Sequence, residues 1–464
     1  MKKLLYLFHR RFAVALSIPL VLWALSGMLH PMMANWFKPH LTRTFLPPKP
    51  LVFDSSALPP AEAFSDLKEV HQLKVISLEG QAAYLAITPE QSLHYRWLNG
   101  TEIVDGHRRH AIDLARAYLD DVSSPVEKVS VHEEFSSTYT TINRYLPAYR
   151  VQLQRNDSME VVVDLRTGKL ASYDNSSKRV MLRLFSWFHT WSFLGSPSSP
   201  LRIIIVGLIS FGALLVAFSG LASILFIKRP RSQKTRLSIR WHRFLGLSTA
   251  VIYLMFGLSG FAHLLMKLRA DDAPQQVSGQ KVSVSKLNLV PQPQSEIHVL
   301  GASLAIVGEE PYYRLLLKGE SRPLVQYTHS QTGLTRPDAE EEFARQLALE
   351  FSGYRKEEIS ETELINEFRS DYGFIFKRLP VWRVSFPGKP YWQYTVDTAD
   401  SHLSMRTDLP SLIEALGFIN FHKWHFLDFA GRETRDWATV IGASSLLILF
   451  ASGLCMVWAK RKKQ

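Results

Sequence analysis

Cysteine is nearly absent from this sequence, whose 464 residues include one, Cys455. A single cysteine excludes an internal disulfide, a four-thiolate zinc or iron–sulfur site, and the CxxCH attachment of a c-type haem. The sequence also lacks a GxGxxG motif after a strand, the fingerprint of dinucleotide-binding folds. We therefore expect no disulfide framework and no flavin or nicotinamide site within this chain.

Charged residues are absent from four long apolar runs, at residues 12–29, 203–227, 244–266 and 437–459. Each run is close to or above the ~18–20 residues that a membrane-spanning helix needs. The first run, behind Lys2 and Lys3, could instead be a cleaved signal peptide, but the same pattern recurs mid-chain, where no signal peptide can lie. The runs therefore predict four transmembrane helices.

The net charge of +12 is concentrated in three short segments, 2–11, 228–243 and 460–463, which contain fifteen Lys and Arg residues and no acidic residue. The rest of the chain has slightly fewer basic than acidic residues. Basic segments on one side of the membrane are the positive-inside pattern of a bacterial inner-membrane protein. We therefore expect both termini and the 228–243 loop in the cytoplasm and two polar blocks in the periplasm, with lipid rather than nucleic acid around the chain.

The sequence matches itself at one constant offset, which places His9 on His242. At this offset FHTWSFL at 188–194 falls on FHKWHFL at 421–427, and LPAYRV at 146–151 falls on LPVWRV at 379–384. One offset along the chain predicts a tandem duplication with almost no net insertion. Because each copy has two spans, both copies share one orientation, and a pseudo-twofold axis along the membrane normal follows.

Each polar block is predicted to be a small α+β domain, because a helical stretch (110–119 and 343–351) precedes alternating strands. The fold class is therefore membrane α-helical with α+β periplasmic domains. We expect seven divisions: the first span with its cytoplasmic N-terminus (1–35), the first periplasmic domain (36–185), a lead-in and the second span (186–228), a cytoplasmic loop (229–241), the third span (242–268), the second periplasmic domain (269–418), and a lead-in, the fourth span and the cytoplasmic C-terminus (419–464).

Three histidine pairs coincide at the repeat offset, all at or beside the spans: His9 with His242, His30 with His263, and His189 with His422. His9 and His30 are about 31 Å apart along a helix, so they lie near opposite membrane surfaces. Ionisable groups at membrane depth are costly and usually functional, and neutral imidazole is a good axial ligand of haem iron. The pairs predict about two b-type haems, one near each surface.

The sequence predicts a single pair of haem ligands at the cytoplasmic level of the membrane, but several possible pairs at the outer level. The cytoplasmic level offers only His9 and His242, which predicts one haem bridging the two copies. No residue is predicted to be catalytic, because the cofactor supplies the electron chemistry. At the outer level the ligand pair stays open among four paired histidines and one unpaired one: His30, His263, His189, His422 and His425.

Other interpretations of these residues stay open. The histidines could be ordinary interfacial residues beside Arg and Trp, or a metal-transport path could use Met28, Met32 and Met33 as soft ligands. A metal path would need carboxylates or methionines within the spans, and no carboxylate is there. Under the haem hypothesis, Gly27 and Gly260 are expected to let a flat porphyrin approach the helix backbone.

The HRRF and HRFLG motifs at 9–12 and 242–246, the LSGMLH and LSGFAH ends, and the YRV…VVVDLRTGKL strand–turn resemble the PepSY-associated transmembrane family. This family includes iron-regulated membrane proteins and ferric-siderophore reductases. The resemblance implies PepSY-like periplasmic domains, b-type haems held by the six paired histidines, and electron delivery to a periplasmic ferric complex. In the second copy, DTADSHL departs from the family's D-x-x-T-G turn.

The leading hypothesis is a di-haem electron conduit that reduces the iron(III) of a ferric siderophore for iron uptake. Its electrons would come from a flavin protein or from quinol, since no cofactor motif for them is present. Two alternatives remain: a haem-free, membrane-anchored PepSY binding or regulatory module, and a haem subunit that serves a partner enzyme.

Overall fold

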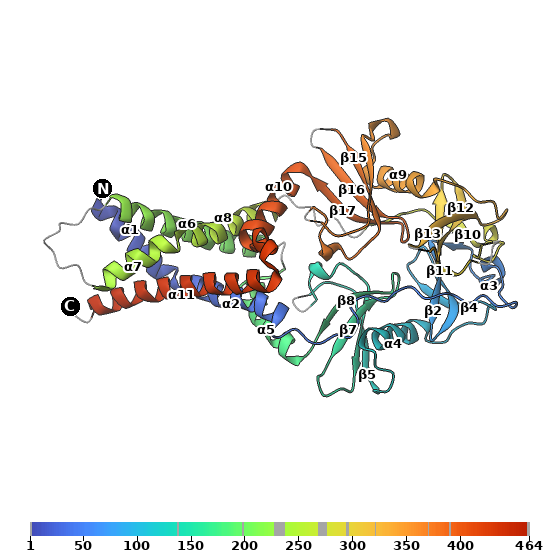
Figure 1. Ribbon diagram of the computed structural model, residues 1–464, viewed down its shortest axis with the longest axis horizontal. Coiled ribbons are helices and arrows are strands. Elements are labelled where there is room, and N and C mark those ends of the chain that lie inside the picture. Colours follow the sequence, from blue (N-terminus) through green and yellow to red (C-terminus); the bar gives the residue numbers. More distant parts are fainter. Residues whose placement is uncertain are drawn as a thin grey trace.

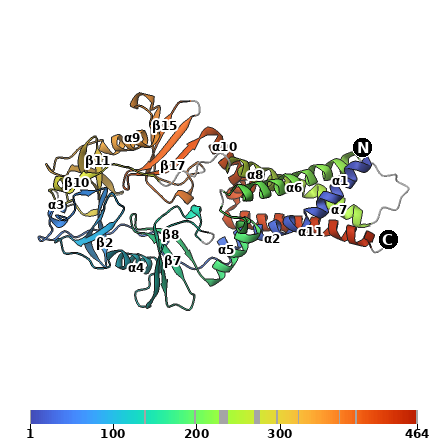
Figure 2. The ribbon, with the colours of Figure 1, turned by 180° about the vertical axis from the view of Figure 1, so that it is seen from behind.

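The computed structural model describes residues 2–136, 139–196, 199–226, 237–267, 276–293, 297–320, 322–369, 371–388 and 391–461. Most of the predicted cytoplasmic loop and the start of the predicted second periplasmic domain lie outside the described residues. A helical bundle forms one end of the molecule and the β-sheets form the other (Figure 1). The start of the first helix and the end of the last lie together at the far end of the bundle, as the reverse view also shows (Figure 2).

Among the described residues, three helices of the bundle are long and apolar enough to cross a membrane: α2 (Ser17–Asn35), α6 (Pro200–Phe226) and α11 (Arg432–Arg461). A fourth span results if α7 (Leu237–Ser248) and α8 (Ala250–Lys267), which are bent by 54°, count as one. Large apolar side chains such as Ile18, Leu208 and Ile441 are exposed on these helices, as lipid contact requires. The protein is thus a membrane protein with three to four candidate spans and α+β soluble parts.

The first helical segment of each half is broken at equivalent positions. α1 (Lys2–Ala15) and α2 separate at Leu16, and α7 and α8 separate at Thr249. The Ser17 and Thr249 hydroxyls donate to carbonyls one turn back, each at 2.8 Å, and such bonds bend helices. The bend changes the packing partner, because α1 packs on α6 whereas α2 packs on α11, and α7 packs on α11 whereas α8 packs on α6. The two halves therefore interlock.

In the described part of the chain, the soluble end contains three larger antiparallel sheets and one short two-stranded one, β1 (Glu69–Val70) with β10 (Val282–Ser283). Helix α4 (Gly106–Leu119) packs on the four-stranded sheet, and α9 (Ala339–Ser352) packs on the five-stranded sheet. The four-stranded sheet consists of β5 (Val126–His132), β6 (Ala148–Leu153), β7 (Glu160–Asp164) and β8 (Lys169–Asp174). The five-stranded sheet consists of β14 (Glu361–Ile365), β15 (Val381–Phe386), β16 (Trp392–Asp397), β17 (His402–Asp408) and β9 (Gln276–Val277).

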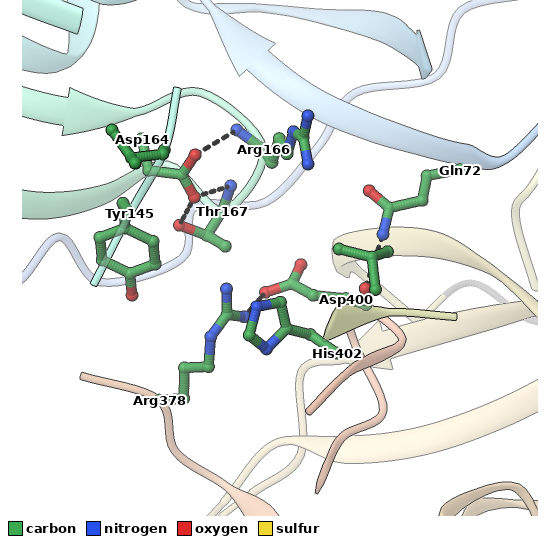
Figure 3. A pocket seen from close by; sticks show the side chains of 10 residues that line it. Gln72, Tyr145, Asp164, Arg166, Thr167, Arg378, Asp400 and His402 are labelled. Atoms are coloured by element: carbon green, nitrogen blue, oxygen red, sulfur yellow. Dashed lines mark hydrogen bonds and ion pairs between the residues drawn. The ribbon is translucent and has the colours of Figure 1, made fainter. Parts of the chain in front are cut away.

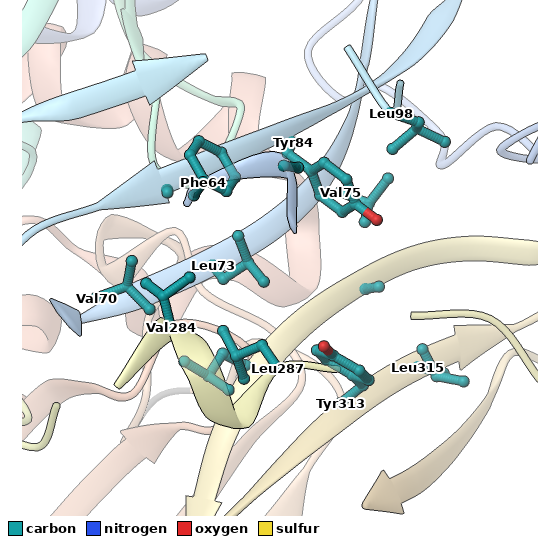
Figure 4. Close-up of a cluster of buried hydrophobic side chains, with 14 of the residues drawn as sticks. Phe64, Val70, Leu73, Val75, Tyr84, Leu98, Val284, Leu287, Tyr313 and Leu315 are labelled. Atoms are coloured by element: carbon teal, nitrogen blue, oxygen red, sulfur yellow. The ribbon is translucent and has the colours of Figure 1, made fainter. Parts of the chain in front are cut away.

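A six-stranded sheet joins the two halves of the chain. Its strand order is β13-β12-β11-β2-β3-β4, and the halves meet where β2 pairs with β11, with Val75 opposite Ala302. The core on this sheet mixes residues of both halves, such as Leu73 and Tyr84 with Leu287 and Tyr313 (Figure 4). The strands are β2 (Gln72–Leu78), β3 (Gln81–Ile87), β4 (Leu93–Trp97), β11 (Val299–Val307), β12 (Glu310–Leu317) and β13 (Leu324–His329).

The single repeat offset predicted from the sequence is wrong for this sheet. The offset that relates the histidines also places the start of α4, Gly106, on the start of α9, Ala339. It places Gln81, the start of β3, on Arg314, whereas β12 already begins at Glu310. Small length differences before and after these strands cancel, because exposed turns tolerate insertions. The segments with the six paired histidines lie outside this region, so their correspondence is unaffected.

Candidate functional site

His9 of α1 and His242 of α7 lie side by side near the sheet-distal end of the bundle. Their ring centres are 6.5 Å apart, and the ring planes are inclined by 47°. His9 Nδ1 lies 3.0 Å from the Val216 carbonyl oxygen and 3.3 Å from Ser219 Oγ, both on α6. His242 Nδ1 lies 2.8 Å from Ser452 Oγ on α11. Each ring is therefore oriented by the second spanning helix of its own half.

A glycine follows each of these serines and leaves room for the ring. A Cβ on Gly220 would lie 2.9 Å from His9 Cε1, and a Cβ on Gly453 would lie 3.3 Å from His242 Cε1. The first distance is shorter than real Cβ contacts, so any larger residue would displace the ring of His9. These serines and glycines belong to the sequence SGL, which occurs at 219–221 and again at 452–454, at the repeat offset. The two histidine rings lie against this motif.

The same arrangement occurs at the sheet-proximal end of the bundle. His189 follows α5 (Ser176–Phe188), and its Nδ1 lies 3.3 Å from Ser26 Oγ on α2. His422 ends a π-helical turn after α10 (Leu409–Gly417), and its Nδ1 lies 3.2 Å from Ser259 Oγ on α8. The Trp23 indole also donates to the His189 carbonyl oxygen at 3.1 Å. The predicted pair His189 and His422 is thus brought into equivalent surroundings.

Burial keeps these two histidines neutral. It lowers the pKa of His189 to about 4, and it lowers the pKa of His422 to about 3, with further repulsion from His189 and His263. At neutral pH both imidazoles therefore retain a lone pair on one ring nitrogen. A neutral imidazole is the form that binds haem iron.

His30 and His263 have different partners from the other paired histidines. His263 stacks on Phe418 at 4.1 Å, and its Nδ1 lies 2.8 Å from Glu414 Oε1. The His30 ring lies 6.0 Å from Phe185, and Met181 occupies the sequence position equivalent to Glu414. Among the described residues, neither ring is one of the neighbours of a glycine that follows a serine. Their role as ligands stays a prediction.

The remaining candidates take part in other contacts. His425 Nδ1 lies 2.9 Å from Asp428 Oδ2, and its Nε2 lies 3.2 Å from Arg435 Nη1, so it belongs to a polar network at the bundle rim. The Sδ of Met28 accepts a hydrogen bond from Ser444, and Met33 is buried. Within the described ranges, no group of three or more His, Cys, Asp or Glu residues could hold a metal ion.

The inner histidine pair fits a shared haem iron. Two imidazoles on one iron, each with a ring nitrogen about 2 Å from the metal, have ring centres about 6 Å apart. The 6.5 Å between His9 and His242 meets this requirement. Gly27 and Gly260 were predicted to lie against a porphyrin, but they lie against histidine side chains in the structure. Ideal Cβ atoms at these glycines would lie 3.5 Å from His189 and 3.3 Å from His422. These glycines face histidine rings.

A polar cavity of about 40 Å³ lies where the two soluble halves meet (Figure 3). Arg378 donates to Asp397 at 2.8 Å and to Asp400 at 2.5 Å, and both carboxylates are buried. The ring nitrogens of His402 and the hydroxyl of Tyr145 line the cavity without a hydrogen-bond partner among the described residues. The volume suits about three waters and is far below the hundreds of Å³ of ligand pockets. This cavity therefore does not serve a siderophore.

The family model described as PepSY-associated TM region matches residues 6–461. The chain belongs to this family. The match covers both halves, including all six paired histidines, and confirms the resemblance seen in the motifs. A comparison with curated proteins found no match.

The serines that contact the paired histidines of this PepSY-associated protein were not predicted from the sequence. Ser219 and Ser452 were visible only as part of a repeated SGL motif, and Ser26 and Ser259 as part of LSG. The signal for them was their recurrence inside spans that otherwise contain few polar residues. The contact itself joins segments far apart in the chain and could not be predicted from local patterns.

Proposed function

We propose that this protein is an inner-membrane electron conduit that holds two b-type haems and reduces iron(III) in a periplasmic ferric siderophore. In this proposal four spans from a tandem duplication cross the membrane about a pseudo-twofold axis, with both termini in the cytoplasm. The observation that carries it is the four histidines at two levels of the bundle, each with Nδ1 engaged by a serine. His9 and His242 would hold one haem, and His189 and His422 the other.

The protein's residues would fix the cofactors and exclude water. Haem b, when bound, supplies one-electron transfer. The four histidines would hold the haem iron as neutral imidazoles, and the apolar spans keep their surroundings at low dielectric, which favours neutral side chains. His30 and His263 stay as alternative outer ligands.

The substrate chemistry needs no acid–base residue. Iron(III) is held tightly by the hard oxygen ligands of a siderophore, and it becomes iron(II) on accepting one electron, which weakens that hold. The donor, a flavin hydroquinone on a cytoplasmic protein or a membrane quinol, is oxidised in exchange. The protein contributes distance, potential and orientation.

The test uses full-length protein purified in detergent from haem-replete cells. We expect a Soret band that shifts with dithionite, and haem that acid–acetone extracts. His9→Ala and His242→Ala should each lower the haem content by a similar amount, whereas His298→Ala, an exposed histidine in the soluble part, should not. A colourless preparation would support the haem-free binding module.

The acceptor is tested on the reduced protein under anaerobic conditions. Ferric hydroxamate and catecholate complexes are added with a ferrous chelator, and haem reoxidation is followed beside formation of the ferrous complex. With at least one of these ferric complexes, we expect haem reoxidation and formation of the ferrous complex to proceed together. Reoxidation by oxygen or a partner protein, but by no ferric complex in a broad panel, would favour an electron-transfer subunit.

A further inference from the structure

Four times in this structure, a histidine ring lies on a serine–glycine pair of a spanning helix. We call each arrangement a cradle, defined by the serine, the glycine and the ring. Each spanning segment supplies one pair, and the histidine always comes from another segment. The cradles are Ser26-Gly27 with His189, Ser219-Gly220 with His9, Ser259-Gly260 with His422, and Ser452-Gly453 with His242.

The hydrogen of each serine hydroxyl already has an acceptor. Ser219 donates to the Val216 carbonyl at 3.1 Å, and Ser452 donates to the Leu449 carbonyl at 2.7 Å. Ser26 and Ser259 donate in the same way to carbonyls one turn back, at 2.6 and 2.5 Å. A hydroxyl has one hydrogen, so a serine that donates to its helix carbonyl accepts from the histidine.

These hydrogen bonds determine which ring nitrogen of each histidine carries the hydrogen. A nitrogen that faces an accepting serine oxygen must carry the proton, so the hydrogen lies on Nδ1. The Val216 carbonyl, 3.0 Å from His9 Nδ1, can only accept and leads to the same conclusion. Nε2 is then the ring nitrogen that keeps a lone pair.

We propose that the serine and glycine of each cradle are positioning residues for axial haem ligands. The serine holds the Nδ1–H tautomer and makes the imidazole a stronger electron donor to iron. The glycine leaves room for the ring at the helix surface. Outer partners of this kind orient metal-bound histidines, and losing one typically costs about 10–100-fold in metal affinity. The inference rests on the proposed haem function and assigns four serines and four glycines to it.

The glycines give a graded series. An added Cβ would approach the ring to 2.9 Å at Gly220, 3.3 Å at Gly260 and Gly453, and 3.5 Å at Gly27. The last is an ordinary van der Waals contact, so Gly27→Ala should have the smallest effect of the four glycine variants, whereas Gly220→Ala must move His9. Gly207→Ala is the matched control on α6, because its Cβ would meet Leu264 at 3.5 Å and no histidine.

The serines have matched controls as well. Ser223 on α6 and Ser445 on α11 donate to carbonyls of their own helices, at 2.7 and 2.6 Å, and no described histidine contacts them. Ser223→Ala and Ser445→Ala thus remove the same atom from the same helices outside the cradles. Ser219→Thr keeps the hydroxyl and should restore what Ser219→Ala loses.

The experiment measures haem per protein, the low-spin haem spectrum and the midpoint potential of each haem in full-length protein. We expect Ser219→Ala and Ser452→Ala to raise the potential of one haem and weaken its retention by about 10-fold. Ser26→Ala and Ser259→Ala should do so for the other haem. Gly220→Ala should exceed Gly27→Ala in effect.

Two failures are distinguishable. Haem-replete wild type with cradle variants that match Ser223→Ala and Gly207→Ala in haem content, spectrum and potential would overturn this inference and leave the proposed function standing. A haem-free wild type would overturn both. If Gly220→Ala does not fold, the serine variants with Ser219→Thr still decide the matter.

Discussion

Arg378 shows how one side chain connects the two soluble halves. It donates to the buried carboxylates of Asp397 and Asp400, and its guanidinium lies over the ring of Tyr145, from the other half, at 5.3 Å. Burial alone would raise the pKa of Asp400, but Lys74 and Arg378 hold it well below its ordinary value. The sequence equivalents of Tyr145 and Arg378 are each other, so the duplicated positions have diverged into a contacting pair.

We expect Arg378→Met to destabilise the soluble part by about 3–5 kcal/mol, because it leaves the buried carboxylate of Asp397 without its cation and that of Asp400 with Lys74 alone. Denaturant unfolding followed by tryptophan fluorescence measures the loss. Arg355→Met is the control, since the side chain of Arg355 is 81% exposed. A loss below about 1 kcal/mol would mean that water from the neighbouring cavity replaces the guanidinium.

Among the elements, those with local periodicity could be predicted from the sequence. Both helices α4 and α9 were predicted, as were strands following each of them, because their apolar residues recur at helical or alternate spacing. The four apolar runs coincide with the three candidate spans and with the bent pair α7–α8, although the run 12–29 is divided between α1 and α2. Periodicity does not reveal a bend such as the one at Leu16, which depends on side-chain hydrogen bonds to the backbone.

The six-stranded sheet could not be predicted. Val75 and Ala302 pair across the sheet from opposite halves of the chain, and nothing in either strand identifies the other as its partner. The predicted periplasmic domains, 36–185 and 269–418, remain sequence-based divisions whose strands share this sheet. Sequence patterns similarly identified the candidate histidines, whereas their serine partners depend on helix packing.

We expect the fragment 36–185 alone to expose the β2 edge and the apolar face around Leu73 and Val75, and therefore to dimerise or aggregate. Co-expression with the fragment 269–418 should give a soluble heterodimer, because β11 restores the pairing. Size-exclusion chromatography with light scattering distinguishes these states. A monomeric, cooperatively folding 36–185 fragment would contradict the expectation and show that each half folds independently.

In the whole molecule, near-symmetry in the bundle is combined with asymmetry at its rim. The four cradles recur in both halves, but the contact between His263 and Glu414 has Met181 in place of the carboxylate in the first half. In the network of His425, Asp428 and Arg435, the first two residues likewise have Ser192 and Gly195 at the equivalent positions of the first half, whereas Arg435 is matched by Arg202. The shared part of the pattern thus coincides with the proposed ligands, and the divergent part lies next to the soluble halves.

The proposed orientation is testable because the chain has a single cysteine. In a Cys455→Ser background, V122C places a thiol at an exposed position of the soluble part, and S238C places one at the start of α7. If the sheets are periplasmic, a membrane-impermeant maleimide should label V122C in intact spheroplasts but label S238C only after permeabilisation. The basic residues beside α7 predict this result, since Lys and Arg near span ends stay in the cytoplasm. The reverse labelling pattern would invert the topology and remove the periplasmic ferric complex as the substrate.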